Sequence, residues 1–137
     1  MTTEIVVRGA SLGEAFVETV LALFARAVDP VTIDSRETRE TRAHGVSPEA
    51  LLAHWIGECA YVYEVEDFIC AAIDLAVFDI QPQVGGEPLR LYAFLHGEAV
   101  DPARHRLRAT SMTVSPDRIT ISNLGADEWS IRLVVQD

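Results

Sequence analysis

The chain has 137 residues, of which 49% are hydrophobic and 23% charged, so its length and composition fit one globular domain spanning residues 1–137. Its formal net charge is −10 and all 11 basic residues are arginines, which excludes Schiff-base and P-loop lysines and argues against direct nucleic-acid binding. No apolar run approaches the ~20 residues that cross a bilayer, and the first residues lack the basic flank of a signal peptide, so we expect a cytoplasmic protein without a membrane span.

The first part of the chain predicts a short strand followed by an amphipathic helix. Residues Glu4–Gly9 are rich in β-branched side chains. Ser11, followed three residues later by Glu14, is a capping box, and Asp29-Pro30 is a stop signal. Apolar residues recur between these signals at helical spacing, which predicts a helix over residues 11–28: Leu12, Phe16, Val20, Leu23 and Ala27.

A polar strand and a second helix are predicted next. Residues Val31–Gly45 contain the near repeat RETRETR, whose alternating charges and threonines are typical of a solvated edge strand. Ser47, Pro48 and Glu49 then provide an N-cap, a proline at the first helical position and a first-turn acid. The apolar stripe that follows predicts a helix over residues 47–64, with Leu51 or Leu52, Trp55, Cys59 and Val62 on its buried face.

Metal-binding residue types occur around this second helix. His54 and Glu58 are four residues apart, which is the spacing of a helical metal-binding pair. The sequence offers no third ligand, so a surface pair is the alternative, with Glu58 as a candidate contact residue. Cys59 and Cys70 lack both CxxC and zinc-finger spacing, so we expect reduced thiols in the core.

From Phe68 onward the pattern changes to alternating or continuous apolar residues, which predicts strands joined by turns. The turns are expected at Gly85-Gly86, at Gly97-Glu98, at 115–118 and at 124–127. The expected strands are Ala71–Ile80, Arg90–Leu95, Thr110–Val114, Arg118–Ser122 and Trp129–Val135. Helices in the first half and strands in the second indicate an α+β fold, with two amphipathic helices packed on a mixed, mostly antiparallel sheet of about six or seven strands.

A polar loop within the strand-rich half is the densest titratable segment of the chain. His96, Glu98, Asp101 and His105 lie within ten residues, which leaves acid–base chemistry open. The alternative is ordinary turn chemistry begun by Asp101 and the proline after it. In that case Arg104 and His105 would be solvated. If the loop instead serves structure and partner contact, Arg104 can pair with Asp101 or Glu98 and His105 can donate to a backbone carbonyl, so that the group locks the loop in shape.

Segments spread over the whole chain resemble the archease family. Gly97–Leu107, GEAVDPARHRL, is similar to the GEPFDPERHEL-type segment of that family. Gly9–Phe24 resembles its first helix, Ser47–Glu66 its second helix and the closing WSIRLVVQD its last strand. The matching segments follow one another in the family's order.

This resemblance implies a function without catalysis. Archeases are small acidic accessory proteins, so the chain would be an activator or chaperone of a GTP-dependent RNA ligase in tRNA splicing or RNA repair. Partner contact would then fall to the loop residues Glu98, Asp101, Arg104 and His105. The alternative is a small-ligand-binding protein or a hydrolase that uses the His96–His105 cluster. The sequence leaves the oligomeric state open.

The resemblance also implies a divalent cation, calcium or magnesium. The family begins with a His-Thr-Ala-Asp segment whose Asp helps to form a metal site, and its last strand usually carries an Asp near its end. Here the chain starts at Met1-Thr2-Thr3, after the point at which the first of these would occur. When the last strand is aligned with the family by Trp129 and Arg132, Gln136 occupies the position of the family's aspartate, and Asp137 lies one residue later. Asp137 is therefore the one candidate ligand, and weak cation binding is expected.

Overall fold

The computed structural model describes residues 1–81, 88–110 and 112–136. It contains two α-helices, α1 (Leu12–Ala27) and α2 (Pro48–Glu66), and two short 3₁₀ turns, η1 (Pro30–Thr32) and η2 (Pro116–Arg118). Its strands are β1 (Thr2–Gly9), β2 (Glu37–Gly45), β3 (Phe68–Asp79), β4 (Leu89–Ala99), β5 (Ile119–Gly125) and β6 (Glu128–Gln136). The predicted α+β class is confirmed.

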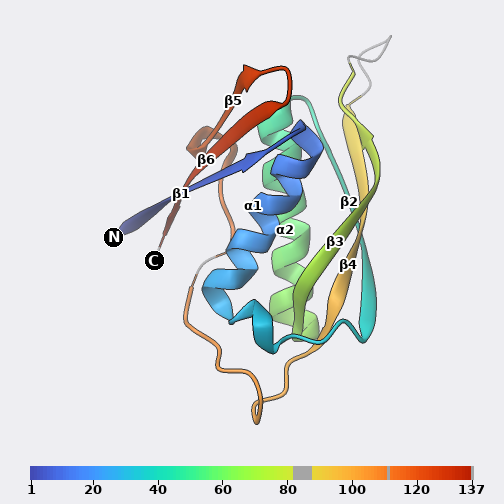
Figure 1. Cartoon of the computed structure of the whole chain (residues 1–137), viewed down its shortest axis with the longest axis vertical. Coiled ribbons are helices and arrows are strands. Elements are labelled where there is room, and N and C mark those ends of the chain that lie inside the picture. Colours follow the sequence, from blue (N-terminus) through green and yellow to red (C-terminus); the bar gives the residue numbers. More distant parts are fainter. Residues whose placement is uncertain (82–87, 111, 137) are drawn as a thin grey trace.

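The strands form two separate three-stranded sheets, in the orders β1-β6-β5 and β2-β4-β3, and α1 and α2 lie between them (Figure 1). All pairings among the described residues are antiparallel. The expectation of one mixed sheet therefore needs correction. It arose because hydrophobic patterning identifies strands and their faces but carries no record of which strands pair.

Both helices begin as the capping signals predict. The side chain of Ser11 accepts a hydrogen bond from the Glu14 backbone N–H, and that of Ser47 accepts one from the Ala50 N–H, each at 3.1 Å. In each case a strand ends in glycine two residues before the capping serine. The second helix runs two residues beyond its predicted end and stops where Asp67 adopts a left-handed conformation with φ of 52°.

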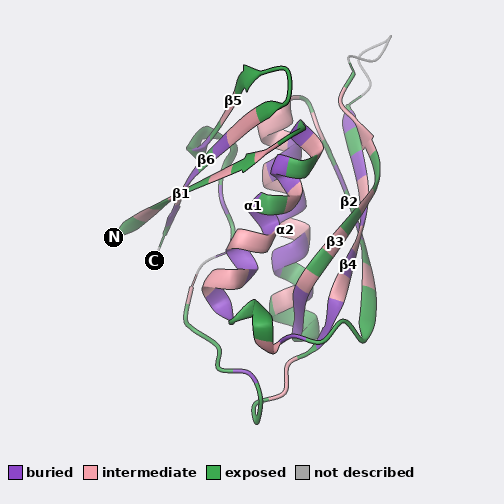
Figure 2. Ribbon diagram, in the orientation of Figure 1, coloured by how far each residue is buried: buried purple, intermediate pink, exposed green. Residues whose placement is uncertain are grey.

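The main core lies between the helices and the inner faces of both sheets, where buried residues face one another (Figure 2). Trp55 is fully buried, and its indole Nε1–H donates to Thr41 Oγ1 at 2.9 Å. Thr41 in turn donates to the Ala93 carbonyl at 3.2 Å, so the one polar atom of the indole is satisfied. Cys59 and Cys70 are free thiols in this core, as predicted, and burial raises the pKa of Cys70 to about 12. Among the described residues no helix is long and apolar enough to span a membrane.

Two local predictions in the strand-rich half are wrong. The described residues of Thr110–Val114 form no strand, although Met112 and Val114 are buried, because alternating burial without a neighbouring strand produces only a packed extended segment. At Gly97-Glu98 the chain does not turn, because β4 continues to Ala99. The turn predicted at Gly85-Gly86 lies outside the described residues.

Candidate functional site

Glu98 is the centre of a hydrogen-bonded network at the end of β4. The residue is only 4% exposed, and its carboxylate accepts hydrogen bonds from the Arg104 guanidinium, from the Asp34 backbone N–H at 2.6 Å and from the His105 ring at 3.2 Å. The Arg104 side chain, with help from the Asp34 N–H, lowers the pKa of Glu98 to about 2. Glu98 is therefore ionised throughout the neutral range and acts as a fixed acceptor.

His105 fastens the loop to the rest of the molecule. Its Nδ1 accepts a hydrogen bond from the Asp101 backbone N–H at 2.8 Å, so the ring proton sits on Nε2. From there it is shared between the Thr32 carbonyl at 3.0 Å and Glu98 at 3.2 Å. The side chain has no exposed surface and both ring nitrogens are hydrogen-bonded. His105 therefore stabilises the loop and has no free nitrogen for a substrate.

Arg104 and Asp101 form the exposed side of the same network. The Arg104 Nε lies 3.2 Å from Asp101 Oδ2, and its Nη1 lies 3.4 Å from Asp34 Oδ2. The Ala103 backbone N–H, followed by the Arg104 side chain, lowers the pKa of Asp101. With side chains 38% and 46% exposed, Arg104 and Asp101 present a fixed pair of opposite charges to solvent.

Sequence reasoning missed the segment around Asp34, which completes this network. Arg36 pairs with Asp34 at 3.1 Å, and its backbone N–H donates to the Gly97 carbonyl at 2.8 Å. Nothing in the local pattern marks Asp34, because its partners Glu98 and Arg104 lie 64 and 70 residues away in the sequence.

His96 belongs to a different arrangement on the outer face of the β2-β4-β3 sheet. Its Nε2 lies 2.7 Å from Asp74 Oδ2 and its Nδ1 lies 3.0 Å from Thr38 Oγ1. The expected His96–His105 cluster therefore does not converge on a single site, because Glu98, Asp101 and His105 meet while His96 pairs elsewhere. The order carboxylate, imidazole, hydroxyl is nevertheless that of a hydrolase triad, in which the ring withdraws the hydroxyl proton.

The predicted helical pair on α2 is present as a surface contact. His54 Nε2 lies 3.2 Å from Glu58 Oε1, and His54 Nδ1 accepts from the His44 backbone N–H at 3.0 Å. Within residues 1–81, 88–110 and 112–136, no three His, Cys, Asp or Glu side chains gather into a group that could hold a metal ion. Asp137, the other predicted metal ligand, lies outside these ranges. The described residues therefore do not fit the divalent cation that the resemblance implies.

Comparison with known proteins places this geometry in a family. A model of the "Archease protein family" matches residues 3–136. The chain belongs to the archease family. "Protein archease" of Pyrococcus abyssi is 26% identical over 135 residues, covering 97% of this chain and 92% of that protein. "Protein archease" of Pyrobaculum neutrophilum is 30% identical over 131 residues, covering 93% and 83%.

A solved structure has a fold similar to that of this chain. The solution structure of protein 1598 of Methanobacterium thermoautotrophicum matches with a TM-score of 0.73, covering 99% of this chain and 92% of that one. The sequence identity is 16%, so this likeness shows the fold alone.

Proposed function

We propose that this archease-family chain is an accessory protein, an activator or chaperone, for a GTP-dependent RNA ligase in tRNA splicing or RNA repair. The observation that carries the proposal is the family match over residues 3–136. The net charge of −10 supports it, because an acidic surface approaches a basic RNA-processing enzyme more readily than it approaches RNA itself.

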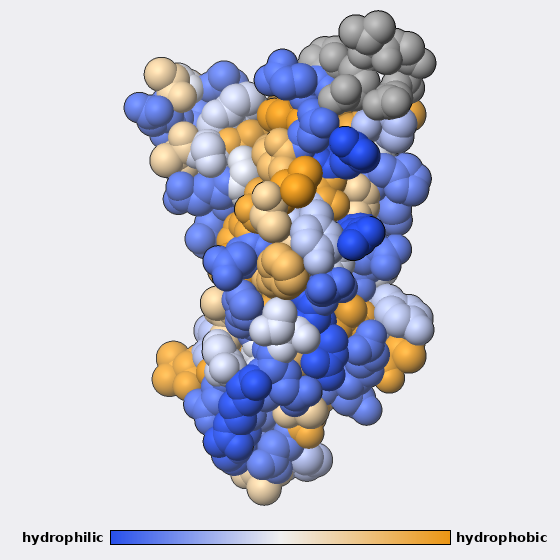
Figure 3. Space-filling view, turned by 90° about the vertical axis from the view of Figure 1, so that its right-hand side faces the viewer, coloured by the Kyte–Doolittle hydropathy of each residue, from blue (hydrophilic) through white to orange (hydrophobic). Residues whose placement is uncertain are grey.

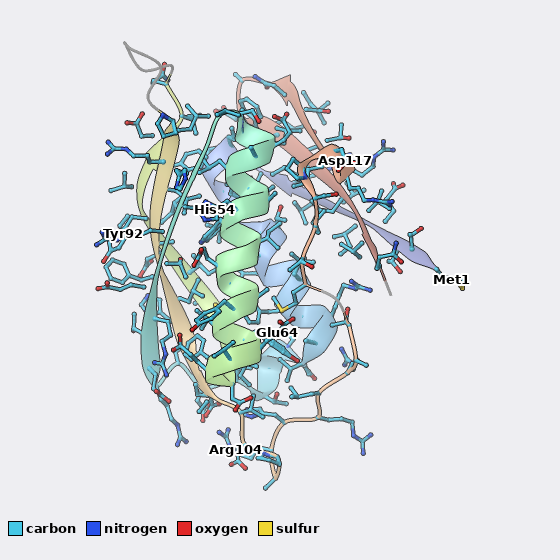
Figure 4. All side chains as sticks on the ribbon, turned by 180° about the vertical axis from the view of Figure 1, so that it is seen from behind. Met1, His54, Glu64, Tyr92, Arg104 and Asp117 are labelled. Atoms are coloured by element: carbon cyan, nitrogen blue, oxygen red, sulfur yellow. The ribbon has the colours of Figure 1, made fainter. Side chains whose placement is uncertain are left out.

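The exposed half of the Glu98 network is the surface that we assign to partner contact. Arg104 lies at one end of the molecule, in the loop that follows β4 (Figure 4). Glu98 and His105 are buried beneath it and hold Arg104 and Asp101 in place. A guanidinium that is already fixed loses little side-chain entropy on docking, so this loop suits recognition of a partner carboxylate.

The proposal predicts a loss of ligase stimulation without loss of fold. Arg104→Ala should weaken stimulation of the cognate ligase, measured as guanylylation rate against accessory-protein concentration, by about tenfold, because a charge-assisted contact is lost. His105→Ala should weaken it as well, by releasing the loop. As a control, Arg132→Ala removes an exposed arginine from the β1-β6-β5 sheet and should leave stimulation unchanged.

The Thr38–His96–Asp74 arrangement favours a second candidate function, that of a hydrolase. Purified Arg104→Ala and His96→Gln variants distinguish the two candidates when assayed without ligase on phosphate and acyl esters. An accessory protein should be inactive alone. Turnover that persists in Arg104→Ala and disappears in His96→Gln would overturn the accessory proposal.

A further inference from the structure

The outer face of the β2-β4-β3 sheet carries a hollow of about 520 Å³ near the Gly45 end of β2. It is built from two cross-strand rows, in which Tyr92 lies between Arg42 and Val77, and Arg90 lies between His44 and Asp79. Tyr92 projects from this sheet away from the helices (Figure 4). On this side of the molecule hydrophobic and hydrophilic residues are interspersed rather than separated (Figure 3).

The Arg42 guanidinium is held in this hollow by stacking on the Tyr92 ring and not by an ion pair with any carboxylate of the described residues. Its guanidinium carbon lies 4.7 Å from the centre of the Tyr92 ring, which in turn packs edge-on against Phe94 at 5.0 Å. Throughout the described residues Arg42 forms no ion pair, whereas Arg39, three positions earlier, contacts both Glu37 and Glu66. The N–H donors of Arg42 are therefore positioned by stacking and remain available to a ligand.

Arg90 brings a second positive charge that is only loosely neutralised. It lies 3.7 Å from Asp79 and keeps 63% of its side chain exposed. With Arg42, Arg90 and Asp79 counted, the hollow carries one net positive charge on a protein whose overall charge is −10. Val77, which is 47% exposed, and Tyr92 provide an apolar wall beside these donors.

We propose that this hollow binds a nucleoside monophosphate group, with the phosphate at Arg42 and Arg90 and the base against Tyr92 and Val77. Guanidinium groups match phosphate oxygens bidentately, and a planar base gains from stacking on an arginine or aromatic plane. The site would take one nucleotide, so it does not require the extended basic surface that nucleic-acid binding needs and that the net charge of −10 argues against. It is independent of the proposed ligase role, since it uses the other end of the sheet.

The test is a titration of the full chain with guanosine monophosphate, followed by amide chemical shifts. Saturable shifts should occur at Arg42, Val77 and Tyr92. Arg42→Gln should raise the dissociation constant about tenfold or more, since a charge-assisted contact is lost. Asp79→Asn should lower it. The matched control Arg132→Gln makes the same charge change on the other sheet and should bind as the unmodified chain does.

Parallel titrations with inorganic phosphate and with guanosine separate the two halves of the ligand. Each should bind at least tenfold more weakly than the nucleotide if both halves are recognised. Equal binding of phosphate alone would overturn the nucleotide assignment. Shifts confined to another surface, or equal weakening in Arg42→Gln and Arg132→Gln, would overturn the site.

Discussion

At the scale of single residues, Glu98 shows how one carboxylate can organise a loop. Its two oxygens accept from one guanidinium and one imidazole of adjacent residues, Arg104 and His105, and from the backbone N–H of Asp34, far away in the chain. Each partner stabilises the ionised form, so protonation would weaken all of these contacts together.

Acid unfolding should therefore depend on Glu98. Its pKa is about 2 in the folded chain and 4.5 ordinarily, so its contribution is complete above pH 4.5 and is lost as the pH falls toward 2. The free energy of unfolding from urea titrations at pH 6, 4.5 and 3 should fall less steeply in Glu98→Gln than in the unmodified chain. Glu128→Gln removes an exposed acid paired with Arg8 and should keep the original slope. Identical slopes in all three proteins would contradict this account.

The members of the network that lie close in sequence could be predicted, and the distant ones could not. Asp101, Arg104 and His105 occur within one turn, so their proximity follows from the chain itself. Thr32 and Asp34 are distant in sequence, and the contacts that they make with His105 and Glu98 use backbone groups that every residue possesses. His96 was misplaced for a related reason: it lies within β4, and its partners Asp74 and Thr38 belong to β3 and β2, so its contacts depend on strand pairing.

At the scale of elements, two glycines differ in how closely another part of the backbone approaches them. Gly97 in β4 lies opposite Cys70 beside a bulge in β3, and a Cβ at position 97 would lie 1.8 Å from the Ile69 carbonyl oxygen. Gly57 lies inside α2, and a Cβ there would meet no atom within 4 Å. Gly97 is required because a β-carbon would clash with the backbone of β3, whereas Gly57 only lowers the stability of α2.

The two positions should respond to alanine in opposite directions. Gly97→Ala should destabilise the chain by about 3 kcal/mol or more, because a β-carbon must displace backbone. Gly57→Ala should stabilise it by about 0.5–1 kcal/mol, the helix-propensity difference between the two residues. Thermal and urea unfolding of the two variants beside the unmodified chain measure both changes. Stabilisation by Gly97→Ala would mean that the bulge yields easily.

Helix limits were predictable because their signals are local, whereas strand pairing was not. Ser11 and Ser47 each act within one turn, so the sequence placed both helix starts within one residue. The two bulges in β3, at Cys70/Ala72 and Leu75/Val77, each shift the inward-facing register by one residue. No composition rule identifies such an insertion in advance.

At the scale of the whole molecule, the acidic charge does not by itself make a metal site. Hard cations require several converging oxygens, and the described residues contain no such group. Calorimetric titration with calcium and with magnesium should therefore give dissociation constants weaker than about millimolar, the range of the weakest protein sites. Asp137→Asn should change neither titration. Micromolar binding would show that acids beyond the described residues complete a site.

The pairing of β1 with β6 joins Thr2 to Gln136 and places the two ends of the chain side by side (Figure 1). During synthesis β1 is made before all the other described elements, and β6, the strand with which it pairs, is made after them. Until then the inward side chains of β1, Ile5 and Val7, have no sheet partner. The β2-β4-β3 sheet, whose strands all lie nearer to one another along the chain, can assemble before β6 is made. The β1-β6-β5 sheet is thus the last part of this fold that can be completed.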